Sequence, residues 1–292
     1  MNQAYYETFH EISAQGIHLS YLTTPGGYHP LHWHEELEIL YPLNGEADII
    51  IEGRKYRLLK RHIMVVESRQ VHSTYAYQST SMFICVHISK KYMQKYLPDI
   101  ELYQIHCIPE EIDTEHFSSY LETCQLMEAL TKLYMVENIP TFSMESEGII
   151  LQILSRLLRF FSHSVISRDI DFSISSFDRL RIIITYVEEH FRAPISLQEG
   201  ADQLGFTKEY FCRFFKKNMG ISFLKYINEI RLTHIYQDLI HTDTPIAVLI
   251  EENGFLNQKL FNRLFKELYG CTPSSVRASA KHPTIQTFAQ NN

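Results

Sequence analysis

The sequence predicts an α+β chain of two domains, a small β-rich domain followed by an all-α domain. Three observations support this prediction. The chain has 292 residues, of which 45% are hydrophobic, enough for about two packed domains. Short alternating segments separated by turn residues run from residue 17 to about residue 90. In the last third of the chain, one helical pattern occurs twice, about 50 residues apart.

Turn signals divide the N-terminal strands. Asn44-Gly45 is typical of a type I′ hairpin turn. Glu52-Gly53 lies between segments 48–51 and 55–58, which read as two short strands. We therefore expect a small all-β unit here.

Histidines and a glutamate recur within these strands. His32 and His34 precede Glu38, and His72 follows later. Because side chains alternate along a strand, His32 and His34 share a face, and Glu38, an even number of residues on, can share it. A barrel would bring these side chains together in its interior.

This spacing resembles the first cupin motif, with Gly27 before the histidines and Gly45 after Glu38, and His72 stands in the place of the second motif's histidine. The resemblance implies a cupin-like β-barrel. The second motif is eroded, because residues common in the superfamily's enzymes are replaced by Arg61-His62, Ser68 and Ala76. This weakens the case for an enzyme.

Two interpretations of the cluster remain open. Three imidazoles and a carboxylate could hold a divalent transition metal such as Zn, Fe, Mn or Ni. Alternatively, the side chains line a polar ligand pocket by hydrogen bonding, and no cofactor is needed. The candidate metal ligands are His32, His34, Glu38 and His72, and the candidate effector-binding residues are these four together with Trp33.

Two amphipathic helices are expected from about residue 115 to residue 165. They pack against the barrel or form a dimer interface. Their apolar stripes are Phe117, Tyr120, Leu121, Cys124, Met127 and Leu130, then Ile150, Ile153, Leu154, Leu157, Leu158 and Phe161.

A short polar segment, residues 166–176, has the composition of a linker between domains. The predicted domains are therefore residues 1–165, for ligand sensing and dimerisation, and residues 177–292, which should be helical.

The C-terminal domain carries several helix start signals. Ser196 and Glu199 form a capping box, and Thr244-Pro245 and Thr272-Pro273 each place an N-cap before a proline at the first helical position. A helix through residues 227–239 should connect two units rigidly, because ~15 helical residues span about 20 Å.

The last strongly patterned helix has a base-reading composition. Leu260, Phe261, Leu264, Phe265 and Leu268 form an apolar stripe, and Gln258, Lys259, Asn262 and Arg263 lie opposite. Arg and Lys can pair with the guanine edge, and Gln and Asn with the adenine edge. For one helix alone, the alternative is a solvated amphipathic face.

The repeat of this pattern favours DNA recognition. Gly205-Phe206 corresponds to Gly254-Phe255 at an offset of 49, whereas Arg213 corresponds to Arg263 at an offset of 50. The chain therefore contains two helix-turn-helix units, and the second turn is one residue longer.

Residues 177–280 resemble the DNA-binding domain of AraC/XylS-type transcription regulators, through Gly254-Phe255, Phe261, Arg263, Phe265-Lys266, Gly270 to Pro273, and Arg277. Ile235 and Ile250 depart from the family's usual alanines, and such overpacking costs ~1–3 kcal/mol unless neighbours are smaller. The resemblance places base contacts at Glu209, Cys212 and Arg213 in the first unit and at Gln258, Lys259, Asn262 and Arg263 in the second. Lys216, Lys217 and Lys266 are better placed for phosphate.

The resemblance also implies partners. We expect a sequence-specific regulator that binds double-stranded DNA, is controlled by a small-molecule effector, with a sugar as the leading class, and forms a homodimer. An activator would in addition contact RNA polymerase. The rival prediction is a metal-dependent cupin enzyme that carries a DNA-binding domain, and a third is a regulator with a ligand-free barrel.

Charge and cysteine usage agree with a cytoplasmic protein that binds DNA through its C-terminal half. The net charge is −7, but residues 177–292 carry 14 Lys and Arg against 12 Asp and Glu, whereas residues 1–176 carry 13 against 22. The five cysteines have no paired spacing. We expect no disulfide, no leader peptide and no membrane segment.

Overall fold

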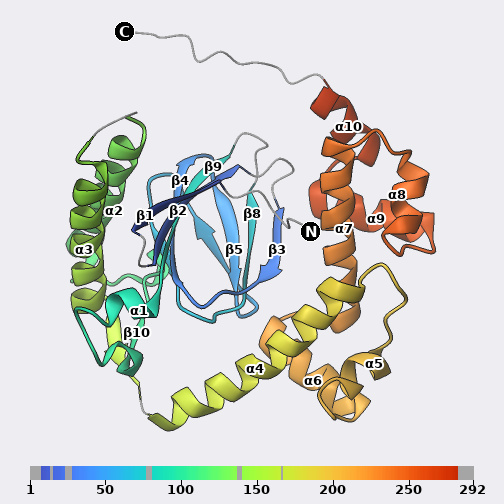
Figure 1. The fold of residues 1–292 in the computed structure, drawn as a ribbon, viewed down its shortest axis with the longest axis horizontal. Coiled ribbons are helices and arrows are strands. Elements are labelled where there is room, and N and C mark those ends of the chain that lie inside the picture. The colour runs from blue at the N-terminus through green and yellow to red at the C-terminus, as the bar shows by residue number, and fades with distance from the viewer. Residues whose placement is uncertain are drawn as a thin grey trace. The chain divides into compact units, whose positions relative to one another are not determined.

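The computed structural model describes residues 8–13, 16–23, 28–76, 81–136, 140–165 and 167–281. The chain divides into two units, with the main boundary between Arg179 and Leu180. The N-terminal unit is sheet-rich and the C-terminal unit is helical (Figure 1). The predicted fold class is therefore confirmed.

Two antiparallel sheets build the N-terminal unit. The larger sheet has the order β1-β2-β9-β4-β7 and the smaller has the order β3-β8-β5-β6, with a short β10-β11 pair outside them. The elements are β1 (Thr8–Ser13), β2 (Ile17–Thr23), β3 (Tyr28–His32), β4 (Leu37–Asn44), β5 (Ala47–Ile51), β6 (Arg54–Leu58), β7 (Met64–Val66), β8 (His72–Ala76), β9 (Met82–Ile88), α1 (Lys90–Met93), η1 (Ile100–Leu102), β10 (Tyr103–Ile105), η2 (Pro109–Glu111), α2 (Phe117–Tyr134), α3 (Phe142–Phe160) and β11 (Ser162–Ser164).

Strand β4 of the larger sheet is buried on both faces along most of its length, and strand alternation determines which side chain meets which layer. On β4, Leu37, Ile39 and Tyr41 join the core shared with α2 and α3. The intervening Leu40 joins a second core, which it shares with strands of the smaller sheet. Glu38 has the same parity as Leu40, so it lies on the face toward the smaller sheet.

One of the two expected turns forms a hairpin. β5 pairs with β6 around Glu52 and Gly53. Both turn residues have positive φ, 49° and 80°, as a type I′ turn requires.

The prediction of a hairpin at Asn44-Gly45 is wrong. β4 pairs with β7 and β9, whereas β5 pairs with β6 and β8. Of the two turn residues, Gly45 alone has positive φ, at 79°. The turn therefore carries the chain from one sheet to the other instead of folding it back on itself.

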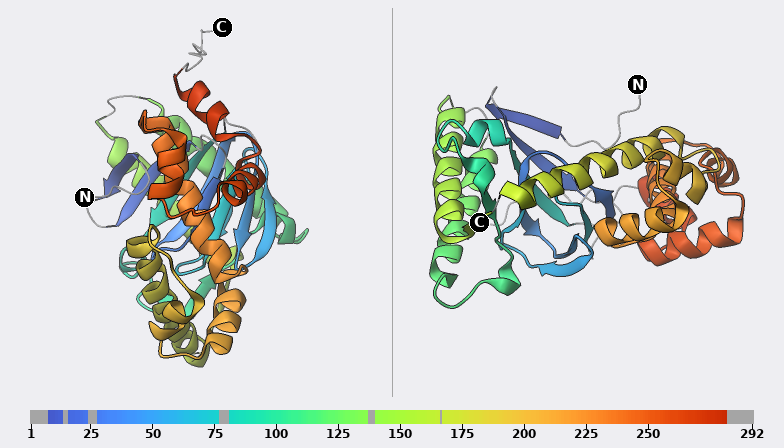
Figure 2. Two further views of the ribbon diagram at one scale, coloured as in Figure 1. Left: turned by 90° about the vertical axis from the view of Figure 1, so that its right-hand side faces the viewer. Right: turned by 90° about the horizontal axis from the view of Figure 1, so that it is seen from below.

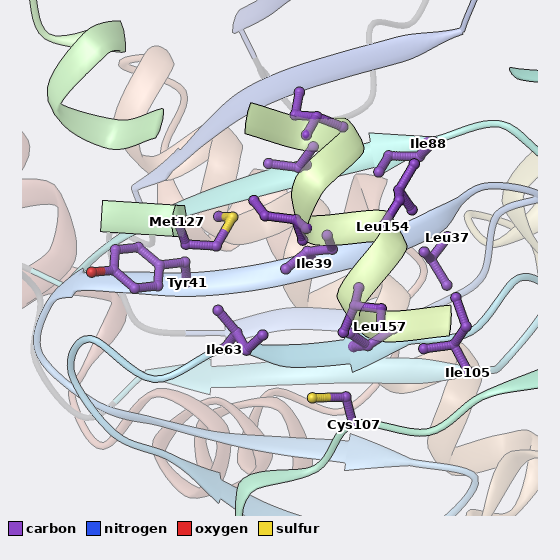
Figure 3. Close-up of a cluster of buried hydrophobic side chains, with 14 of the residues drawn as sticks. Leu37, Ile39, Tyr41, Ile63, Ile88, Ile105, Cys107, Met127, Leu154 and Leu157 are labelled. Atoms are coloured by element: carbon purple, nitrogen blue, oxygen red, sulfur yellow. The ribbon is translucent and has the colours of Figure 1, made fainter. Parts of the chain in front are cut away.

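The two amphipathic helices are present as α2 and α3, which lie side by side along one face of the sheets (Figures 1 and 2). Leu154 and Leu157 of α3 are 4% and 0% exposed and pack with Leu37 and Ile39 of the sheet (Figure 3). The apolar stripe of α3 was expected either to pack against the barrel or to form a dimer interface. Leu154 and Leu157 pack against the barrel. They are not available as an external dimer interface.

The predicted linker is helical. α4 spans Ser167–His190 and so includes nearly all of residues 166–176. The segment contains neither glycine nor proline, so nothing in its sequence interrupts a helix despite its polar composition.

The C-terminal unit consists of helices. The predicted capping box at Ser196 and Glu199 is present, and α10 begins at Pro273 as predicted. Pro245, however, is the N-cap of α8 and not its first helical residue. The helices are α4 (Ser167–His190), α5 (Leu197–Asp202), α6 (Lys208–Met219), α7 (Phe223–His241), α8 (Ile246–Glu252), α9 (Gln258–Tyr269) and α10 (Pro273–Lys281).

α7 is the central connection between the two helix-turn-helix units. It has 19 residues and therefore spans roughly 28 Å. Ile235 on α7 and Ile250 on α8 are both buried, at 0% and 4% exposure. The core of this unit therefore accommodates the two isoleucines.

Among the described helices, none combines the length and the apolar character needed to cross a bilayer.

Candidate functional site

Two cross-strand pairs, one from each sheet, build a histidine and glutamate cluster in the N-terminal unit. Glu38 on β4 lies directly opposite His87 on β9, and His32 on β3 lies directly opposite His72 on β8. The two sheets contribute to a shared core next to these positions. Pairing within each sheet and packing between the sheets therefore bring four side chains from four strands together.

Glu38 is the centre of the cluster. Its Oε2 atom lies 2.9 Å from His72 Nε2 and 3.3 Å from His34 Nε2, and its Oε1 atom lies 3.5 Å from His87 Nε2. Glu38 is 4% exposed, His72 1% and His87 8%. A nearly buried carboxylate is thus surrounded by three imidazoles.

The cluster perturbs the acidity of its members. Burial alone would raise the pKa of Glu38, but hydrogen bonds from His34 and His72 hold the pKa of that carboxyl well below its usual range. Burial lowers the pKa of His87 to about 4 and, together with neighbouring His72, lowers that of His32. Burial opposes the charge on His34 as well, yet the hydrogen bond to Glu38 raises its pKa. The lowered pKa keeps the Glu38 carboxyl ionised, and this carboxylate in turn favours the protonated form of His34.

His34 reaches the cluster by a different route from the one predicted. β3 ends at His32, and His34 lies in the loop before β4, so strand alternation does not place it. Instead, His34 Nδ1–H donates a hydrogen bond to the Glu36 carbonyl at 3.0 Å, and the His34 carbonyl accepts one from Arg69 N–H at 2.9 Å. Trp33 is part-buried in the same loop.

Two histidines of the cluster were not predicted from the sequence. His87 follows Phe83 and Cys85 at the spacing of one strand face, which is the signal that could have identified it. His29 contacts His32, with 3.1 Å between their Nδ1 atoms. Two groups of three, His32, His34 and His72 or His34, Glu38 and His87, have potential metal-ligand atoms within 4.8 Å of one another.

In the C-terminal unit, the predicted DNA-contacting side chains lie on the surfaces of α6 and α9. Each helix buries aromatic residues, Phe211 and Phe215 on α6 and Phe261 and Phe265 on α9. Cys212 is part-buried, and the other candidates are exposed, namely Glu209, Arg213, Lys216, Lys217, Gln258, Lys259, Asn262, Arg263 and Lys266.

The predicted apolar stripe of α9 is only partly core. Leu260, Leu264 and Leu268 are part-buried and, with residues of α7, line a groove of about 320 Å³. Arg263 and Glu267 border this groove, with 3.7 Å between Arg263 Nη1 and Glu267 Oε1. Both are exposed, so the ion pair is weak and leaves Arg263 available to a partner.

Two family models match the chain. Residues 16–154 match an AraC-like ligand binding domain, and residues 201–279 match a helix-turn-helix domain. The multiple antibiotic resistance protein MarA of Salmonella typhimurium is 32% identical over 100 residues, which cover 34% of this chain and 79% of MarA.

The chain belongs to the AraC family of transcription regulators.

Other proteins are similar over more of the chain. The HTH-type transcriptional regulator SAR0107 of Staphylococcus aureus is 25% identical over 260 residues, 88% of this chain. The chain spans about a third of that relative's length, 33%. A structure of ToxT from Vibrio cholerae is 12% identical, with a TM-score of 0.46, and the match covers 90% of this chain and 98% of ToxT.

The two family matches contain both sets of candidate residues. The histidine and glutamate cluster lies within the AraC-like ligand binding match, and the exposed side chains of α6 and α9 lie within the helix-turn-helix match. Each set of candidate residues therefore lies in a different one of the two matched domains.

Proposed function

We propose that this protein is a transcription regulator that binds specific DNA sequences under the control of a small molecule. The observation that carries the proposal is the surface of α9, where Gln258, Lys259, Asn262 and Arg263 are all exposed on one helix of a helix-turn-helix unit. Gln and Asn suit adenine, and Lys and Arg suit guanine. The exposed Arg213, Lys216 and Lys217 give α6 a second positively charged surface.

Helices α6 and α9, the proposed recognition helices, should contact adjacent parts of one DNA site. They are joined by α7, which at roughly 28 Å is close to one DNA turn of about 34 Å. Selection from a random duplex pool with the full chain tests the proposal. We expect enriched sequences with two short elements about one turn apart, and a pool without enrichment would contradict sequence-specific binding.

We propose that the effector binds at Glu38 and its histidines, and that it is a sugar. An ionised carboxylate accepts hydrogen bonds from hydroxyl groups, imidazoles can donate or accept, and the part-buried Trp33 offers an aromatic face for a sugar ring. The relative SAR0107 is named as an HTH-type transcriptional regulator, which favours ligand binding over catalysis at this cluster.

A thermal-shift screen of sugars tests the effector site. A sugar that raises the melting temperature of the wild-type chain should have little effect on Glu38→Gln, because the neutral amide cannot replace the carboxylate as a charged acceptor. Glu46→Gln is the matched control, since Glu46 forms an exposed ion pair with Arg57. Equal shifts for wild type and Glu38→Gln would place the ligand elsewhere.

A divalent transition metal is a second candidate occupant, favoured by the donor atoms that lie within 4.8 Å of one another. His34, Glu38 and His87, or His32, His34 and His72, would hold it, because neutral imidazole and carboxylate suit Zn, Fe, Mn or Ni. Metal analysis of the protein purified without chelator distinguishes the two occupants. About one equivalent of metal, lost in Glu38→Ala, would favour the ion over the sugar.

We further propose a homodimer formed through the outer surface of α2 and α3. Phe117 and Leu121 of the predicted stripe occupy successive turns of α2 and remain 45% and 40% exposed, whereas its other members, Tyr120, Cys124, Met127 and Leu130, are buried. In a twofold contact each residue of the patch occurs twice. Phe117→Glu with Leu121→Glu should therefore bring like charges together and raise the dimer dissociation constant by about tenfold or more.

Sedimentation checks this prediction, with Leu59→Glu as a control of similar exposure outside the two helices (42%). If the double variant and the Leu59→Glu control had the same dimer dissociation constant, the interface would lie outside α2 and α3.

A further inference from the structure

Leu256 is exposed to an unusual degree. It lies in the turn between α8 and α9 and is 91% exposed, the highest value among the large hydrophobic side chains of the described residues. Isolated exposed leucines are common on protein surfaces, so exposure alone carries little information. The position of Leu256 next to the start of the proposed recognition helix makes its exposure informative.

The turn holds Leu256 in place from both sides. Before it, Phe255 is 5% exposed and packs against Phe261, with 5.4 Å between ring centroids. After it, the Asn257 side chain caps α9 by accepting from Leu260 N–H at 3.0 Å. Leu256 therefore points outward from a turn whose neighbours are fixed.

Gly254 adds a further constraint on this turn. Its φ is +79°, and a Cβ atom there would lie 2.6 Å from the Arg192 carbonyl oxygen. The turn thus packs tightly against the backbone of the segment that follows α4.

The first helix-turn-helix unit has no counterpart of Leu256. There the turn runs from Gly205 and Phe206 directly to Thr207, whose hydroxyl accepts from Tyr210 N–H at 3.3 Å. In the second unit one residue, Leu256, separates Phe255 from the cap Asn257. The residue that lengthens the second turn is therefore the exposed leucine.

We propose that Leu256 is a specificity-determining residue that contacts the methyl group of a thymine in the major groove. This inference rests on the proposed DNA binding. A recognition helix presents its N-terminal residues to base edges, and Leu256 precedes the first residue of α9, Gln258, by two positions. The thymine methyl is the apolar group that a base pair presents in the major groove, so it is the partner that an exposed leucine can recognise.

Replacing single thymines by uracil in the selected duplex tests the proposal, because uracil lacks only the methyl group. At one position, uracil should weaken binding of the full wild-type chain by about three- to fivefold, the factor that corresponds to one buried methyl or methylene group. Leu256→Ala should lose a similar factor on the thymine duplex and should be insensitive to uracil at that position. Fluorescence anisotropy titrations measure all four dissociation constants.

Two variants make the result specific. Arg263→Ala should still respond to uracil at that position, because its own contact lies elsewhere. Leu59→Ala removes a leucine that is 42% exposed in the N-terminal unit and should bind every duplex as the wild type does. An unchanged melting temperature of Leu256→Ala would show that the turn still folds.

Three outcomes overturn the inference. Leu256→Ala could bind as tightly as the wild type, or it could remain sensitive to uracil at every position where the wild type is sensitive. In either case specific binding by α9 stands and only the role of Leu256 fails. If selection yields no specific duplex at all, the proposed function fails, and the role of Leu256 fails with it.

Discussion

Arg263→Ala is expected to weaken binding to the selected duplex by about 1–3 kcal/mol and to relax the preference at one base pair. The Arg263 side chain is exposed on α9 and lies opposite the buried Phe261 and Phe265. Its guanidinium can donate two hydrogen bonds to one guanine, which alanine cannot replace. Titrations against the selected duplex and against its single-base variants measure both effects.

Lys266→Ala is the matched control, since Lys266 is exposed on the same helix and should contact phosphate. This variant should weaken binding to specific and to random DNA alike. It should also reduce the slope of the logarithm of the binding constant against the logarithm of the salt concentration by about one. Equal losses of specific and random binding for Arg263→Ala would assign Arg263 to the phosphate contacts and would contradict the proposed orientation of α9.

Leu154→Ala is expected to lower the free energy of unfolding of the N-terminal unit by about 2–5 kcal/mol. Leu154 is 4% exposed and belongs to the core between α3 and the larger sheet (Figure 3). Truncation removes buried methyl groups and leaves a cavity. The chain contains one tryptophan, Trp33, so tryptophan fluorescence during urea unfolding reports on this unit.

Met144→Ala is the comparison on the same helix. Met144 is 77% exposed, so its truncation should change stability by no more than about 0.5 kcal/mol. If Leu154→Ala unfolded at the same urea concentration as Met144→Ala, this result would contradict the burial of Leu154 between α3 and the larger sheet.

The helical half of the chain could be predicted closely from the sequence. Its signals are local, because Gly205 and Gly254 end one helix and the next begins within a few residues, and the apolar spacing of α9 defines its buried face. Local patterns failed where composition was the main signal. Residues 167–176 are polar in composition, yet they form the beginning of helix α4, since polar composition alone does not stop a helix.

The histidine cluster could be predicted only in part. His32, His34, Glu38 and His72 were identified from spacing along the sequence, but His87 joins them because β4 pairs with β9, more than 40 residues later. Such pairing between distant strands has no local signal. The same limitation explains Asn44-Gly45, where the turn residues are typical of a hairpin but the two strands belong to different sheets.

Occupancy of the Glu38 site should change the affinity of α6 and α9 for DNA. The most direct test is to measure the DNA dissociation constant with and without the sugar identified by thermal shift. We predict a change of about 5- to 150-fold, the usual range for coupling between two sites, and no change for Glu38→Gln. A dissociation constant that stays the same while the sugar saturates the N-terminal unit would contradict the account.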